Sequence, residues 1–158
     1  MTDVATESVW DYPRPPRLEP SSEHVVVSHA GLVLADTTAS LRVLETSHPP
    51  TYYLPASSFA NGVLRPAEGA SWCEWKGQAS YLDLVVGDQV LTGVAWTYPE
   101  PSARFEALRD HVALYPGRVD RCTVDGEVVE PQPGNFYGGW ITSRVTGPFK
   151  GGPGTSGW

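Results

Sequence analysis

Basic side chains are scarce in this chain of 158 residues. Eleven Lys and Arg stand against eighteen Asp and Glu, which leaves a net charge of −7 at pH 7. A protein that binds nucleic acid through its phosphates needs a basic stripe or patch. We therefore expect no nucleic acid among the partners of this chain.

Cysteines and long apolar runs are also few. Cys73 and Cys122 are the only cysteines, and no C-x-x-C pair occurs. Two cysteines cannot make a four-ligand thiolate zinc site. We expect neither a metal nor another cofactor. No apolar run is long enough to cross a bilayer, and the first residues lack the basic and apolar regions of a secretory signal. We expect a cytoplasmic protein without a membrane partner.

Turn-forming and aromatic residues are plentiful. Sixteen Gly and fifteen Pro make up about one residue in five, while charged residues account for only 18% of the chain. Six Trp, seven Tyr and four Phe supply enough ring surface for a core and a pocket. The composition predicts one mainly β (α+β) domain with many turns and little room for long helices.

The distribution of proline and glycine divides the chain into three parts. Residues 1–23 form a Pro-rich arm whose Trp10 and Tyr12 favour docking over disorder. Residues 24–130 form the core domain. Residues 131–158 are rich in glycine but also in aromatics, which predicts an ordered tail packed on the core rather than a flexible linker.

Hairpins are the clearest local signals. Residues 25–27 and 32–34 flank a turn at Gly31, and Asp125-Gly126 separates two further apolar runs. Residues 37–45 fit two structures. The hydroxyl side chains at residues 37, 38 and 40 could cap a short helix, whereas the β-branched residues of the segment favour a strand. Ser102 is a candidate cap for a second short helix.

Lys76 is the first candidate site residue, in the segment Trp72–Gly77. If its aromatic neighbours exclude water from it, its pKa falls and it becomes a base or an imine-forming nucleophile. As a cation, Lys76 could instead bind an anionic group of a ligand. The alternative is a surface ion pair with Glu74 on the same face of a strand.

Arg42, Glu45 and His48 are spaced three residues apart. On a helix they would line one stripe, where a guanidinium, a carboxylate and an imidazole could bind an anion and move a proton. The alternative is an ordinary Arg42–Glu45 ion pair.

Aromatic residues from several segments could form the walls of a pocket with their rings and hydroxyls. The candidates are Tyr52, Tyr53, Tyr81, Trp96 and Tyr98. Rings of this kind also simply fill cores. Cys73 is a candidate nucleophile only with a histidine beside it, and otherwise a small buried apolar residue.

The Gly-rich end, residues 149–158, is not a phosphate-binding loop. Such a loop places its Lys directly after the last glycine, between a strand and a helix, whereas Lys150 precedes the glycines here. We expect this segment to be at most a flap over a pocket.

Four segments occur in the order LRVLETSHPPTYYLP (41–55), CEWKGQASY (73–81), AWTYPEP (95–101) and HVALYP (111–116). Together they resemble the bacterial domain of unknown function 427 family. The likeness covers about residues 24–130. It implies an antiparallel β-tent or barrel-like two-sheet fold with one or two short helices, related to zinc-binding guanine-exchange-like and methionine-sulfoxide-reductase domains.

This chain lacks the C-x-x-C ligands of those zinc-binding relatives, so the resemblance also implies a metal-free domain. It departs from the family pattern at Glu74-Trp75, where Pro-Tyr is usual, and at Gln78, where Glu is usual. The second departure removes a carboxylate two positions from Lys76. The family brings no established activity, and a fold alone does not supply one.

We therefore predict a protein that binds a small molecule, either as an enzyme or without catalysis. Its ligand would be a small anionic or carbonyl-containing metabolite in an aromatic pocket around Lys76, with Arg42 and His48 as further polar groups. The alternative is a non-catalytic module for protein–protein interaction or self-association as a homodimer. A closed pocket at Lys76 favours the first, and a flat apolar patch beside an exposed Lys76 favours the second.

Overall fold

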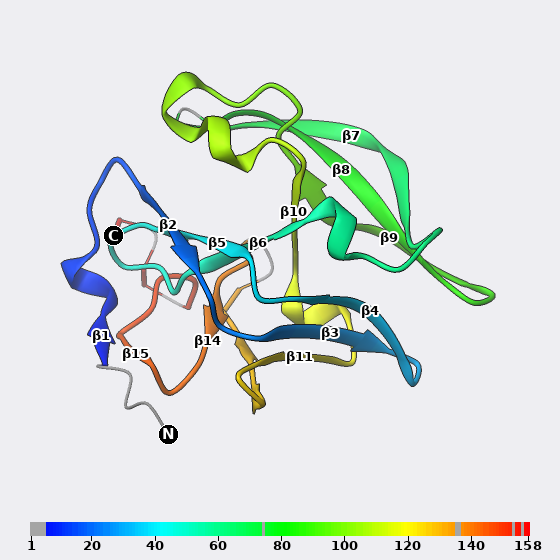
Figure 1. The fold of residues 1–158 in the computed structure, drawn as a ribbon. Helices are drawn as coiled ribbons and strands as arrows, with labels where there is room; N and C mark the ends of the chain where they lie inside the picture. The colour runs from blue at the N-terminus through cyan, green and yellow to red at the C-terminus, as the bar shows by residue number, and fades with distance from the viewer. Residues whose placement is uncertain (1–5, 74, 135–136, 153, 156) are drawn as a thin grey trace.

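Two antiparallel sheets form the body of the protein in the computed structural model, which describes residues 6–73, 75–134, 137–152, 154–155 and 157–158. Figure 1 shows β7, β8 and β9 of the larger sheet on one side and β3, β4 and β11 of the smaller sheet on the other, with β10 between them. Each sheet keeps two free edges in the described residues, so neither closes into a barrel.

The larger sheet has seven strands in the order β2-β5-β6-β10-β9-β8-β7. Their bounds are β2 Arg17–Ser21, β5 Ser40–Leu44, β6 Thr51–Pro55, β7 Leu64–Cys73, β8 Gly77–Val86, β9 Gln89–Thr97 and β10 His111–Leu114. Three prolines fall in its strands: Pro55 ends β6, and Pro20 and Pro66 lie within the edge strands β2 and β7. An edge position tolerates them because no ladder hydrogen bond is needed from their missing N–H groups.

The smaller sheet has the order β12-β11-β3-β4. Its strands are β3 Val25–His29, β4 Leu32–Thr37, β11 Arg121–Val124 and β12 Glu127–Val128. Two short pairs complete the fold: β1 (Glu7–Ser8) runs parallel to β15 (Val145–Thr146), and β13 (Glu130–Pro131) runs antiparallel to β14 (Trp140–Ile141). The β1–β15 pair joins the two terminal regions (Figure 1).

Helical structure among the described residues consists of four short 3₁₀ segments. They are η1 Val9–Asp11, η2 Ala56–Ser58, η3 Ala103–Leu108 and η4 Pro116–Arg118. The prediction of a mainly β, antiparallel fold with short helices is confirmed. No helix in the described part of the chain has the length and hydropathy that crossing a membrane requires.

Residues 37–45 form no helix, and residues 40–44 of this segment form the strand β5. β5 pairs with both β2 and β6, so its β-branched and apolar residues alternate between two packed faces. β7 ends at Cys73, so Lys76 does not lie on a strand, as the alternative of an ion pair on a strand face assumed, but in the turn that leads into β8. Ser102 is the N-cap residue of η3, as predicted, but its side chain makes no capping hydrogen bond, because its hydroxyl donates instead to the Trp75 carbonyl oxygen at 2.7 Å.

Three clusters of buried apolar side chains form the core. The largest lies between the two sheets and includes Tyr52 and Trp140. A second includes Tyr53, Tyr98 and Phe105, with Trp96 and Cys73 packed against it. Because successive residues of β6 point to opposite faces, Tyr52 and Tyr53 belong to different clusters.

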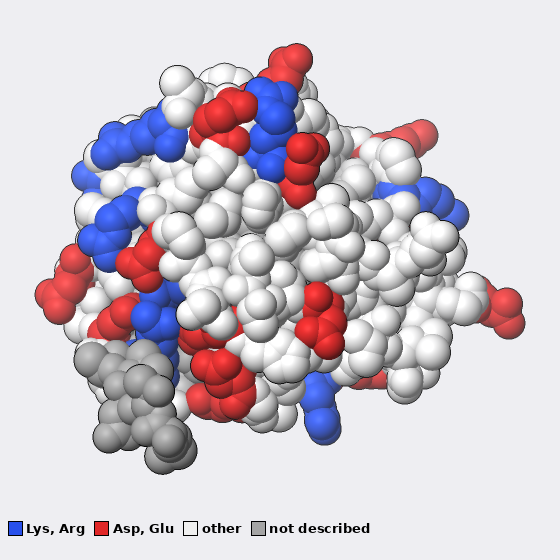
Figure 2. All heavy atoms as spheres, in the orientation of Figure 1, with Lys and Arg blue, Asp and Glu red and all other residues white. Residues whose placement is uncertain are grey.

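The surface carries both signs of charge in small groups. On the face shown in Figure 2, Lys and Arg alternate with Asp and Glu around the rim, and a wide uncharged area lies between them. The coloured atoms of this face form no continuous basic stripe of the kind that nucleic-acid binding needs.

Candidate functional site

A cavity of about 390 Å³ lies where the β7–β8 turn, β6, β9 and the C-terminal segment meet. Its walls are aromatic, with charged groups among them. The lining residues are Glu45, His48, Thr51, Tyr53, Ser71, Trp72, Cys73, Trp75, Lys76, Ala79, Tyr81, Trp96, Tyr98, Tyr115, Gln132, Tyr137, Gly138 and Lys150. Lys76 and Lys150 are the only two lysines of the chain, so we call this hollow the lysine cavity.

Two hydrogen bonds from Ser102 hold the turn that carries Lys76. The Ser102 hydroxyl donates to the Trp75 carbonyl, and the Ser102 N–H donates to the Lys76 carbonyl at 2.9 Å. Gly77 follows with φ of +109°, and a Cβ there would lie 3.3 Å from the Glu100 carbonyl oxygen. The turn therefore needs glycine at this position, both for its backbone angle and for its close approach to the chain at residue 100.

The Lys76 ammonium is half-buried and lies 5.8 Å from the centre of the Tyr98 ring. Burial lowers the pKa of Lys76, but Tyr53, Cys73 and Glu45 outweigh that effect, so its pKa is raised above the ordinary value. Lys76 is therefore a cation at neutral pH. Among the described residues, no carboxylate lies within 4.0 Å of it.

The raised pKa corrects one sequence expectation, because a sheltered lysine was expected to have a lowered pKa. The alternative ion pair with Glu74 lies outside the described residues. Cys73 is half-exposed and lines the cavity, where it interacts with Lys76, so it is not the buried apolar residue that we expected.

Three polar aromatic groups form a hydrogen-bonded unit beside Lys76. The Trp96 Nε1–H donates to the Tyr53 hydroxyl at 3.2 Å, and the Tyr98 hydroxyl is also hydrogen-bonded to Tyr53. Burial is the main reason that the pKa values of Tyr53 and Tyr98 are raised. Both phenols are neutral at physiological pH, and since one of them donates its proton to the other, the unit has one phenolic O–H left to donate to an acceptor in the cavity.

His48 presents a neutral imidazole to the same cavity. Its Nδ1 lies 2.9 Å from the Thr46 carbonyl oxygen, which can only accept, so Nδ1 carries the proton and Nε2 is the bare nitrogen of the neutral ring. Burial lowers the pKa of His48, and Lys150 and Arg14 add to this, against the opposing effects of Thr46 and Glu45. The ring packs edge-on against Tyr137, with 5.3 Å between centroids.

The cavity brings together most of the residues singled out in the sequence. Six of the eight predicted site residues line it: His48, Tyr53, Lys76, Tyr81, Trp96 and Tyr98. The other two, Arg42 and Tyr52, do not. The Tyr52 hydroxyl donates to Glu23 at 2.8 Å, and its ring lies 5.0 Å from that of Trp140.

Arg42 points to the face of β5 opposite the one that carries Leu41 and Val43. There its side chain is fully buried in an ion-pair network. Its guanidinium donates to Glu7 at 2.7 Å and to Glu19 at 3.0 Å. Arg144 from the C-terminal segment reaches Glu7 at 3.1 Å and Glu23 at 2.9 Å. Although burial opposes it, hydrogen bonds from Arg42 and Tyr12 lower the pKa of Glu7 to about 2. We call this set the arginine clasp.

The tail contributes residues that the sequence did not name as site residues, although it suggested residues 149–158, which include Lys150, as a flap over a pocket. Gln132, Tyr137, Gly138 and Lys150 all line the cavity. A Cβ at Gly138 would lie 2.4 Å from Cη2 of Trp96, so glycine is what allows this segment to approach the ring. The aromatics and glycines of the tail were the available signal, but neither shows which part of the core the tail covers.

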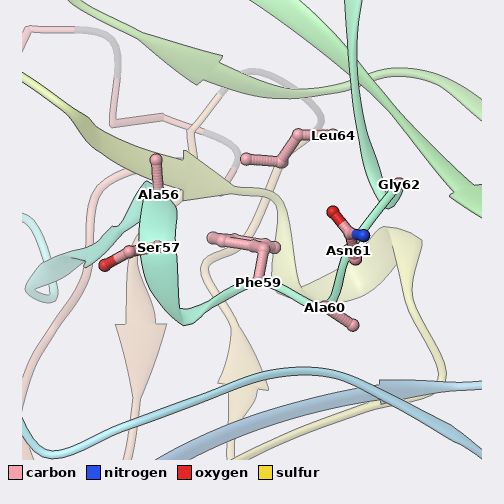
Figure 3. A pocket seen from close by; sticks show the side chains of 7 residues that line it. All are labelled: Ala56, Ser57, Phe59, Ala60, Asn61, Gly62 and Leu64. Atoms are coloured by element: carbon pink, nitrogen blue, oxygen red, sulfur yellow. The ribbon is translucent and has the colours of Figure 1, made fainter.

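Other hollows differ in chemistry. One of about 350 Å³ is lined by Ala56, Ser57, Phe59, Ala60, Asn61, Gly62 and Leu64, none of which titrates near neutral pH. Figure 3 shows the Phe59 ring between the side chains of Ser57 and Asn61, so their polar groups do not converge on one point. The described residues contain no cluster of three or more His, Cys, Asp or Glu side chains able to hold a metal ion.

Comparison with known proteins places the chain in a family but gives it no activity. No curated protein matches it. Residues 17–125, which are more than half of the chain, match a family model described as a domain of unknown function (DUF427). The four segments that suggested this resemblance all fall within the matched range. The chain therefore belongs to the domain of unknown function 427 family.

Proposed function

We propose that this protein binds a small organic anion in the lysine cavity, with Lys76 as the principal cation. The observation that carries the proposal is the state of Lys76. It is half-buried, it keeps its charge, and no described carboxylate lies within ion-pair distance of it. An incoming carboxylate or phosphate would supply the missing partner through charge-assisted hydrogen bonds.

Further groups around Lys76 favour an anion that carries a ring or another flat apolar part. Trp96 and Tyr115 lie 4.7 Å apart on one wall, and Tyr53 and Tyr98 lie 6.2 Å apart beside Lys76. Cavities with apolar aromatic walls and a few polar groups are typical of small-molecule sites. Lys150 adds a second positive charge to the same cavity.

The proposal also includes a group that can accept a proton. The bare Nε2 of His48 belongs to the same cavity as Lys76, so a ligand held by the ammonium lies within a site that contains a base. Of the roles that the sequence left open for Lys76, the raised pKa favours an anion anchor over a neutral amine base or nucleophile. A cytoplasmic location remains part of the proposal, and the two free cysteines suit a reducing compartment.

An interaction module is the second candidate, and Trp72 is the observation that favours it. Its side chain is 75% exposed at the rim of the lysine cavity. None of the other exposed large apolar side chains lines the lysine cavity: Leu32 and Val33 lie on β4, Val128 on β12, Trp10 in η1 and Val90 near the start of β9. We therefore favour ligand binding.

Thermal melting with two probes, phenyl phosphate and benzoate, tests the proposal. At a hundred times its dissociation constant, a probe that binds the folded state adds about 2.7 kcal/mol to the free energy of unfolding. We expect at least one probe to raise the melting temperature of the wild type. Lys76→Met and Lys76→Gln should lose this rise, because each removes the cation while keeping a side chain of similar length.

Arg121→Met is the matched control. Arg121 is an exposed residue of β11 outside the lysine cavity, and its replacement removes the same single charge. The control should respond to the probe like the wild type. If neither probe shifts the wild type at 10 mM, or if the Lys76 variants respond like the wild type, the proposal is wrong. A melting temperature that then depends on protein concentration would favour self-association.

A further inference from the structure

A second hollow of about 250 Å³ adjoins the lysine cavity. It is lined by Tyr115, Pro116, Gly117, Arg118, Pro131, Gln132, Gly134 and Tyr137. Three of these residues, Tyr115, Gln132 and Tyr137, also line the lysine cavity. The two hollows therefore meet at a shared wall, and we call the second one the Arg118 hollow.

The shared wall is fixed by hydrogen bonds. The Gln132 side chain is buried, its Nε2 donates to the Lys150 carbonyl at 2.8 Å, and its Oε1 accepts from the Gly139 N–H at 3.1 Å. Both ends of the amide are thus engaged with the backbone. The ring of Tyr115 packs 4.7 Å from that of Trp96, which belongs to the lysine cavity.

The far side of the Arg118 hollow is also tightly packed. η4 begins at Pro116, and a Cβ on Gly117 would lie 3.2 Å from Cγ of Pro131. The two prolines restrict the backbone on both sides of the hollow. A hollow built in this way is formed before any ligand enters it.

Arg118 supplies an uncommitted positive charge at this place. Its side chain is exposed, and no described carboxylate lies within 4.0 Å of its guanidinium. The positive charge of Arg118 acts on Tyr115, which belongs to the shared wall. Burial raises the pKa of Tyr115, and the charge of Arg118 opposes that rise. In a chain of net charge −7, both lysines and this arginine are therefore found around two adjoining hollows.

We propose that the Arg118 hollow is a second subsite of the same ligand site, and that the ligand is an elongated aromatic dianion. One anionic group binds Lys76, the flat body lies against Trp96 and Tyr115, and the second anionic group binds Arg118. A guanidinium suits this role because its planar N–H groups match a carboxylate or phosphate in two hydrogen bonds. This inference rests on the proposed function.

Pairs of probes that differ by one anionic group test the inference. Each probe with one anionic group is compared by calorimetric titration with its analogue bearing an added carboxylate at the far end of the ring system. The pairs are benzoate and terephthalate, biphenyl-4-carboxylate and biphenyl-4,4′-dicarboxylate, and phenyl phosphate and 4-carboxyphenyl phosphate. Three lengths are used so that one of them can span the two cations.

In at least one pair, we expect the wild type to bind the probe with the added carboxylate at least tenfold more tightly than the probe without it. Arg118→Met should reduce that ratio to about one and leave the affinity for the probe with one anionic group unchanged. Arg118→Lys should retain part of the gain, and Arg121→Met should keep the whole ratio. Lys76→Met should weaken both members of the pair.

The outcomes separate this inference from the proposed function. Binding of a probe with one anionic group that depends on Lys76, with no gain from the added carboxylate in any pair, would overturn the second subsite and leave the first. An unchanged ratio in Arg118→Met would do the same. If no probe of any pair binds the wild type, both proposals fail.

Discussion

The two lysines of the lysine cavity differ in how they are held. The backbone of Lys76 is fixed by Ser102, while its ammonium has an aromatic neighbour and no described carboxylate partner. The Lys150 ammonium already donates to the main-chain oxygen of Trp158 at 3.1 Å. The Lys76 ammonium shares a side-chain hydrogen bond with Cys73, but its three N–H groups allow it to keep that bond and still bind an anion. Unlike Lys150, it donates to no oxygen among the described residues, which is why we assign the principal role to Lys76.

His48 gives the residue-scale prediction, which concerns pH. Because burial lowers its pKa, the unfolded chain binds a proton near pH 6.5 that the folded protein does not bind. The contribution of His48 to stability is therefore complete above about pH 6.5 and declines as the pH falls below that value. In a histidine NMR titration, we expect the His48 ring to titrate below pH 6.5 and to move upward when phenyl phosphate is bound.

The upward shift follows from charge, since an anion beside the imidazole favours its protonated form. His48→Gln identifies the signal and should flatten the loss of stability between pH 6.5 and pH 5 in urea titrations. A His48 midpoint at or above pH 6.5 in the free protein would contradict the assignment of a neutral, buried base.

At the scale of elements, strand alternation explains which predicted residues share the cavity. The prediction that Arg42, Glu45 and His48 line one stripe assumed a helix, in which a spacing of three residues brings side chains together. In β5, Arg42 instead points away from the face that carries Leu41 and Val43, and it enters the arginine clasp. The same alternation separates Tyr52 from Tyr53 in β6.

The arginine clasp gives the element-scale prediction. Arg42 joins Glu7 of β1 to Glu19 of β2, and Arg144 joins Glu7 to Glu23, so the clasp links the first strands to the C-terminal segment. Removing one partner of a buried ion pair leaves the other without compensation. We expect Arg42→Met to lower the free energy of unfolding by about 3 kcal/mol, the low end for such pairs because the carboxylates are partly exposed.

Urea titration measures this loss, with Arg121→Met as the control of equal charge change. The control should stay within about 0.5 kcal/mol of the wild type, as exposed substitutions usually do. A loss below about 1 kcal/mol in Arg42→Met would show that the clasp contributes little to holding the terminal regions on the sheet.

At the scale of the whole molecule, the sequence predicted the fold class better than the site. Composition and hairpin signals were enough for a mainly β, antiparallel fold, because turns and β-branched runs act locally. Residues 64–70 were not recognised as part of β7, because Pro66 and Gly69 interrupt the strand pattern and only an edge position accommodates them. Tail residues such as Tyr137 and Lys150 could not be assigned to the cavity, since their placement depends on contacts with segments about a hundred residues earlier, such as His48.

The central claim is that Lys76 is a sheltered cation that binds an anion, and lysine NMR tests it most directly. With ¹³C at Cε, the two lysines give two signals, and Lys76→Met identifies one of them. Our account predicts that the Lys76 signal titrates above the ordinary value of about 10.4 and moves when phenyl phosphate is added. A Lys76 signal that titrates at or below that value, and that stays in place with both phenyl phosphate and benzoate, would contradict it.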